Sequence, residues 1–61
     1  MSSTQLEKAI KAINNEYAQA AMRCPGRKGR LAVIIRDVAL EAAFAGHVAV
    51  ARGAYKRLQS L

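Results

Sequence analysis

The stretch Cys24-Pro25-Gly26-Arg27-Lys28-Gly29-Arg30 separates two apolar helical patterns in a chain of 61 residues. Pro25 disfavours helical geometry at the residue before it, and Gly26 adopts positive φ without steric cost. These residues predict the end of one helix and a tight turn. The whole sequence predicts an all-α helical hairpin in a single small domain, residues 1–61, with a short helix over 5–23, a basic turn over 24–30 and a longer helix over 31–59.

The segment before the turn has the pattern of an amphipathic helix. Apolar residues recur every three or four positions from Leu6 to Cys24, which is the spacing of one stripe on an α-helix. Thr4 and Glu7 are spaced as a capping box, in which each side chain accepts a hydrogen bond from a free amide of the first turn. Glu7 and Lys11 lie four residues apart, so we expect them to attract one another on the polar face.

The longer segment carries apolar residues on two opposite faces. We expect one face to pack on the helix 5–23 and the other on a second copy of the chain, so that the hairpin dimerises into a helical bundle. One of the two faces contains Leu31, Ile34, Ile35, Val38, Ala42, Ala45 and Ala49. The face assigned to the dimer or partner interface contains Leu40, Phe44, His47, Val48, Ala51, Tyr55 and Leu58.

Two glycines leave a second arrangement open for the longer segment. Gly46 and Gly53 can each kink or divide a helix, because glycine is a poor helix former. The alternative to the hairpin is therefore a chain of three helices with a break near Gly46.

The small size of the chain also favours an oligomer. Domains this short usually gain stability from disulfides, a metal or a partner subunit. One cysteine and one histidine exclude an internal disulfide and disfavour a closed metal site. We therefore predict a homodimer that binds no metal and no cofactor.

The apolar stretch over residues 31–51 is long enough to suggest a membrane span. It contains Arg36, Asp37, Glu41 and His47, and charges near the centre of a span are costly. We predict a helix buried against protein and no membrane insertion. The unpaired thiol of Cys24 and the lack of a secretory leader favour the cytoplasm.

Positive charge gathers at the predicted turn. Ten Lys and Arg residues against four Asp and Glu give a net charge of +6. Four of these cations lie near the start of the second helix, where free amide hydrogens and the helix dipole favour anions. The sequence predicts an anion-binding or partner-binding site at Arg23, Arg27, Lys28 and Arg30.

The run Gly26-Arg27-Lys28-Gly29 resembles the GXXG loop of KH domains. That loop joins two helices and holds a nucleic-acid backbone, so the resemblance implies phosphate binding at the turn. It covers the tetrapeptide and the apolar helix after it. No segment of the chain corresponds to the strands of the KH sheet.

A second resemblance concerns DNA. The run Asp37-Val38-Ala39-Leu40-Glu41-Ala42-Ala43-Phe44, followed by Val50-Ala51-Arg52 and Tyr55-Lys56-Arg57, resembles the helix-turn-helix of AraC-type regulators. It implies that the later segment reads DNA. Ala43 stands where that family favours the turn glycine, and residues 46–50 offer almost no side chains that could read base edges.

The residue types point to binding rather than catalysis. Four acidic residues and one histidine form no evident catalytic dyad or triad, and we predict no enzymatic activity. We predict a small helical protein that binds a partner protein, as an inhibitor or antirepressor-like regulator or as an adaptor, with an acidic protein or a transcription regulator as target. The alternative is a nucleic-acid-binding protein that contacts the phosphate backbone through the basic turn. A basic peptide on a membrane surface is a third possibility, which the alanine-rich faces and the absence of Trp disfavour.

Overall fold

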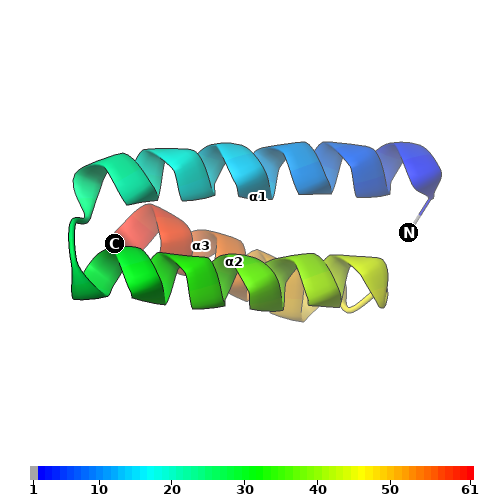
Figure 1. Ribbon diagram of the computed structural model, residues 1–61. Helices are drawn as coiled ribbons and strands as arrows, with labels where there is room; N and C mark the ends of the chain where they lie inside the picture. The colour runs from blue at the N-terminus through cyan, green and yellow to red at the C-terminus, as the bar shows by residue number, and fades with distance from the viewer. Residues whose placement is uncertain (1) are drawn as a thin grey trace.

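Residues 2–61 fold into three helices that run alternately up and down one bundle (Figure 1). The computed structural model describes residues 2–61, with α1 over Ser3–Arg23, α2 over Arg27–Phe44 and α3 over Val48–Ser60. The bundle measures 35 × 16 × 14 Å, so all three helices lie along its length. The all-α class is confirmed, and these residues contain no strand. The two-helix hairpin is replaced by a three-helix arrangement.

Helix α1 begins two residues before the predicted start. The Gln5 amide donates to Ser2 Oγ and the Ser2 amide donates to Gln5 Oε1, both at 3.3 Å. Ser2 forms this capping box because its backbone is extended, with φ −70° and ψ 161°, whereas Thr4 is already helical. The predicted box at Thr4 and Glu7 is therefore wrong.

The turn between α1 and α2 is shorter than predicted. Gly26 has φ +72°, a conformation that favours glycine, and α2 begins at the next residue. A Cβ atom on Gly29 would lie 2.8 Å from the carbonyl oxygen of Cys24, so the first turn of α2 packs closely on the end of α1. The basic segment 24–30 is thus part turn and part helix.

The predicted continuous helix over 31–59 is divided at Gly46. The Gly46 amide donates to the Ala43 carbonyl at 3.2 Å and the His47 amide donates to the Ala42 carbonyl at 2.8 Å. This pair of hydrogen bonds, with φ +80° at Gly46, is the Schellman motif that ends helices. Residues after the break fold back on α2 as α3. The break therefore falls where the three-helix alternative placed it.

Small side chains form most of the core between the helices. Alanines allow close approach of helix backbones, and Leu58 is the largest side chain that is fully buried. Because α3 folds back, residues from both predicted faces of the longer segment are covered within one chain. The core cluster consists of Ile13, Ala20, Ala32, Ile35, Ala39, Ala42, Ala43, Ala51, Ala54 and Leu58.

Candidate functional site

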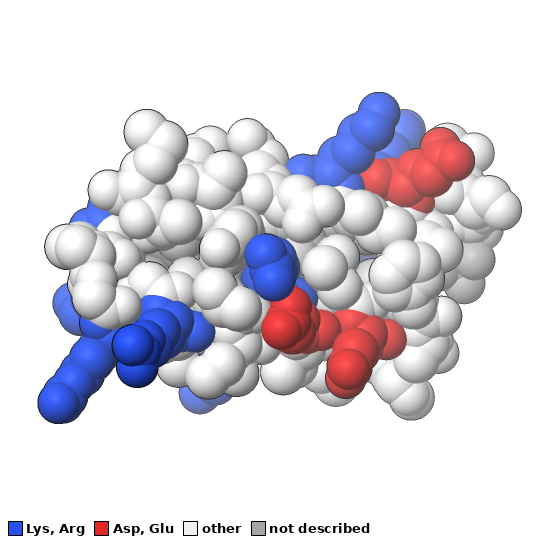
Figure 2. Space-filling model, in the orientation of Figure 1, with Lys and Arg blue, Asp and Glu red and all other residues white. Residues whose placement is uncertain are grey.

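The fold gathers positive side chains at the end of the bundle where α1 ends, α2 begins and α3 ends. The Arg23 guanidinium donates to the Leu58 carbonyl at 3.2 Å, which ties α1 to the last turns of α3. Figure 2 shows several Lys and Arg side chains at this end, on the left, with no Asp or Glu beside them, whereas the other Lys and Arg side chains in view lie next to Asp or Glu. We call it the basic end and define it by the four predicted residues Arg23, Arg27, Lys28 and Arg30 together with Lys56 and Arg57.

The basic end accounts for the whole net charge of the protein. Six of the ten cationic side chains belong to it, and none of the four Asp and Glu residues does. The remaining four cations, Lys8, Lys11, Arg36 and Arg52, are matched in number by the four carboxylates. The rest of the bundle is therefore close to neutral, while one end carries +6.

Two features of the basic end follow from local backbone structure. The first turn of α2 contains Arg27, Lys28 and Arg30 and no acidic residue, and its free amides favour anions, whereas the C-terminal ends of α1 and α3 beside it favour the cations themselves. Arg23 has a structural contact as well, because it satisfies a carbonyl at the C-terminal end of α3. All six side chains of the basic end are exposed.

The two family resemblances find little support in this geometry. Gly26 is required by its positive φ and Gly29 by its closeness to Cys24, and the residues between them are helical rather than part of a loop. Helix α3 runs back along the length of α2 (Figure 1), whereas the two helices of a helix-turn-helix cross at about 90–120°.

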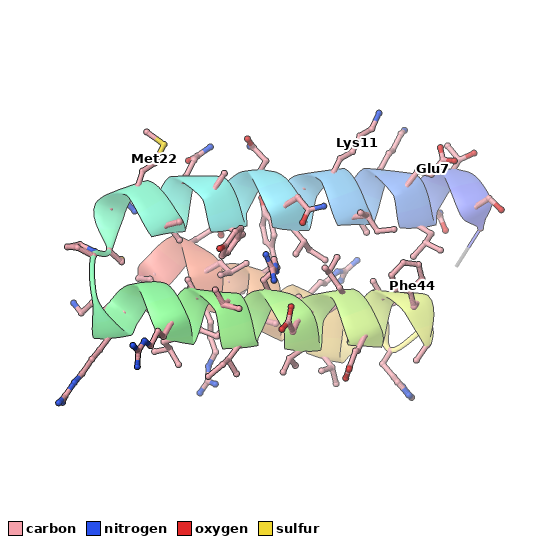
Figure 3. All side chains as sticks on the ribbon, viewed as in Figure 1. Glu7, Lys11, Met22 and Phe44 are labelled. Carbon is pink, nitrogen blue, oxygen red and sulfur yellow. The ribbon has the colours of Figure 1, made fainter. Side chains whose placement is uncertain are left out.

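The predicted dimer or partner interface is divided among three environments. Ala51 and Leu58 are buried in the core of the single chain, because α3 folds back. Leu40 and Tyr55 are partly buried against that core, and the Tyr55 hydroxyl lies 3.4 Å from Glu16 Oε1. The exposed members, Phe44, His47 and Val48, lie around the turn between α2 and α3. Figure 3 shows Phe44 at this end of the bundle, and the residue is 65% exposed.

Three of these residues come together in a groove between α1 and α3. Val48, Ala51 and Tyr55 line one wall of a space of about 610 Å³, and Ala9 and Ile13 line the other. The walls are mainly apolar. Part of the predicted interface thus lines a groove within a single chain.

A second groove lies between α2 and α3 and was not predicted from the sequence. Leu31, Ile34 and Val38 belong to a face that was expected to be covered by a neighbouring helix, and all three are exposed in the single chain. They line a groove of about 330 Å³ together with Val50, Gly53 and Arg57 of α3. The alanines at 32, 39 and 42 mark the buried face of α2, and their spacing was the signal that could have shown this.

Two of the reactive or aromatic side chains, Cys24 and Tyr17, contribute to the packing of the bundle. Cys24 is buried at the end of α1, and the guanidinium of Arg36 lies 4.4 Å from the ring centre of Tyr17. Asp37 forms an ion pair with Arg36 at 3.0 Å. Within residues 2–61 no three His, Cys, Asp or Glu side chains are grouped so that they could hold a metal ion.

Comparison with known proteins gives no relative. The chain matches no protein-family model, none of the curated proteins and none of the solved structures with which it was compared. None of the helices in residues 2–61 combines the length and the apolar character that a membrane span needs.

Proposed function

We propose that this chain is a non-enzymatic binding protein that engages an acidic surface of a partner protein through its basic end. In this role it acts as an inhibitor or antirepressor-like regulator, or as an adaptor. The observation that carries the proposal is the concentration of the whole +6 charge at one end of an otherwise neutral bundle. Charge arranged in this way speeds encounter with an oppositely charged partner and orients it. The lone thiol of Cys24 supports a reducing, cytoplasmic setting.

The positions of the aromatic residues favour a protein over a nucleic acid. Single-stranded nucleic acids are usually held by aromatic side chains on which bases stack. Here Tyr17 lies against Arg36, Tyr55 contacts Glu16, and Phe44 lies at the opposite end of the bundle. The basic end thus offers charge without a stacking platform.

A matched pair of charge reversals tests this proposal. Lys28→Glu with Lys56→Glu alters the basic end, whereas Lys8→Glu with Lys11→Glu alters α1 by the same number of charges. All four lysines are exposed, so both variants should keep the helical circular dichroism of the parent. Immobilised parent and control should capture the same partner from a nuclease-treated lysate of cells that express the protein. The basic-end variant should lose it, and equal capture by both variants would contradict the proposal.

The same charge cluster supports a second candidate function, binding to the phosphate backbone of nucleic acid. Six cations that neutralise phosphates would make the affinity fall about a thousandfold between 50 and 200 mM salt. Titration of random-sequence DNA and RNA at both salt concentrations measures this directly. Tight, steeply salt-dependent binding would favour this second function, and absence of binding at low salt would exclude it.

A further inference from the structure

We infer that the groove between α2 and α3 is a self-association surface, in which two copies pair about a two-fold axis near Ile34 and each α2 lies antiparallel in the groove of the other. The surface shares Arg27 and Arg57 with the basic end, but the test is the oligomeric state of the purified chain, which does not depend on the partner of the basic end. Its first support is the exposure of large aliphatic side chains in one place. Ile34 is 59% exposed and Val50 is 54% exposed, with Leu31 and Val38 beside them. An apolar patch of this kind on a small protein marks an interaction surface.

Gly53 gives a second, independent indication. It lies inside α3 at the wall of the groove, with nothing within 4 Å of the place where a Cβ would be. Glycine inside a helix costs about 0.5–1 kcal/mol relative to alanine, and no contact within the single chain requires it here. A glycine at this position lets another helix backbone approach closely.

The charges along α2 indicate that the occupant is a second copy. Arg27 and Glu41 each lie seven residues from Ile34, on the same face of the helix. When two α2 helices run antiparallel about Ile34, Arg27 of one copy lies beside Glu41 of the other, and the same pairing repeats across the axis. The charges on this face of α2 are thus complementary to those of a second, antiparallel copy, as a two-fold interface requires.

Sedimentation equilibrium of the purified chain tests this pairing. The parent should be a dimer. Ile34→Lys should weaken the dimer at least about tenfold and leave circular dichroism unchanged, because Ile34 is exposed in the single chain. Phe44→Asp is the matched control, since Phe44 is at least as exposed but lies outside the groove, and it should leave the dimer intact.

A charge exchange tests the antiparallel arrangement itself. Glu41→Arg should weaken the dimer, and Glu41→Arg combined with Arg27→Glu should restore it. The inference is overturned by a monomeric parent, by an Ile34→Lys variant that remains a dimer, by dissociation on Phe44→Asp, or by a double variant that is no more dimeric than Glu41→Arg alone.

Discussion

Leu58 is the residue on which the packing of α3 depends most. Its side chain has no exposed surface, and its carbonyl accepts the hydrogen bond from Arg23. The helices around it contribute mainly alanines, which cannot extend to fill a space left by truncation. We expect Leu58→Ala to lower the free energy of unfolding by about 2–5 kcal/mol.

Urea denaturation measures this loss. Met22→Ala is the control, because Met22 is 86% exposed and points away from the bundle in Figure 3. It should change stability by less than about 0.5 kcal/mol. Equal effects of the two substitutions would show that Leu58 is not in the core.

Two helical glycines should respond to alanine in opposite directions. At Gly29 the added Cβ meets the Cys24 carbonyl at 2.8 Å, so Gly29→Ala should destabilise the protein. At Gly53 the space is open in the single chain, and Gly53→Ala should stabilise the monomer by about 0.5–1 kcal/mol through helix propensity. Thermal unfolding at concentrations where the chain is monomeric gives both values. A rise in melting temperature for Gly29→Ala would contradict the close turn described here.

At the scale of helices, Gly46 decides whether the second half of the chain is one helix or two. A residue other than glycine in the left-handed region costs about 1–2 kcal/mol. Gly46→Ala should therefore destabilise the bundle by about that amount, as measured by urea denaturation. Increased helical circular dichroism together with increased stability would show instead that the continuous helix over 31–59 is accessible.

The helix boundaries differ in how far local sequence determines them. Pro25 and Gly26 end α1 by local backbone preferences, so that end was predicted correctly at Arg23. The start was misplaced because Ser2, Ser3 and Thr4 are all good capping residues. The apolar pattern continues on both sides of Gly46, so local sequence also allows a continuous helix there. Packing between α2 and α3 favours the break. Those contacts are not local in sequence.

At the scale of the whole molecule, the return of α3 creates the basic end. In a hairpin with one long helix, Lys56 and Arg57 would lie far from the turn, at the C-terminal end of the helix, where cations complement the helix dipole. The three-helix fold places them beside the four cations that were predicted as a site. Four of the six residues of the basic end were thus predictable from the clustering of charge along the chain. The positions of Lys56 and Arg57 beside them depended on the topology.

The basic end as a single binding surface is the central claim, and heparin affinity chromatography tests it most directly. Three proteins are compared by the salt concentration at which they elute: the parent, Lys28→Glu with Lys56→Glu, and Lys8→Glu with Lys11→Glu. Both variants carry the same net charge of +2, because each replaces two lysines of a +6 chain with glutamates. We predict that the basic-end variant elutes at much lower salt than the α1 variant, which should stay close to the parent. Elution of both variants at the same salt concentration would contradict the claim, because net charge alone would then explain the binding.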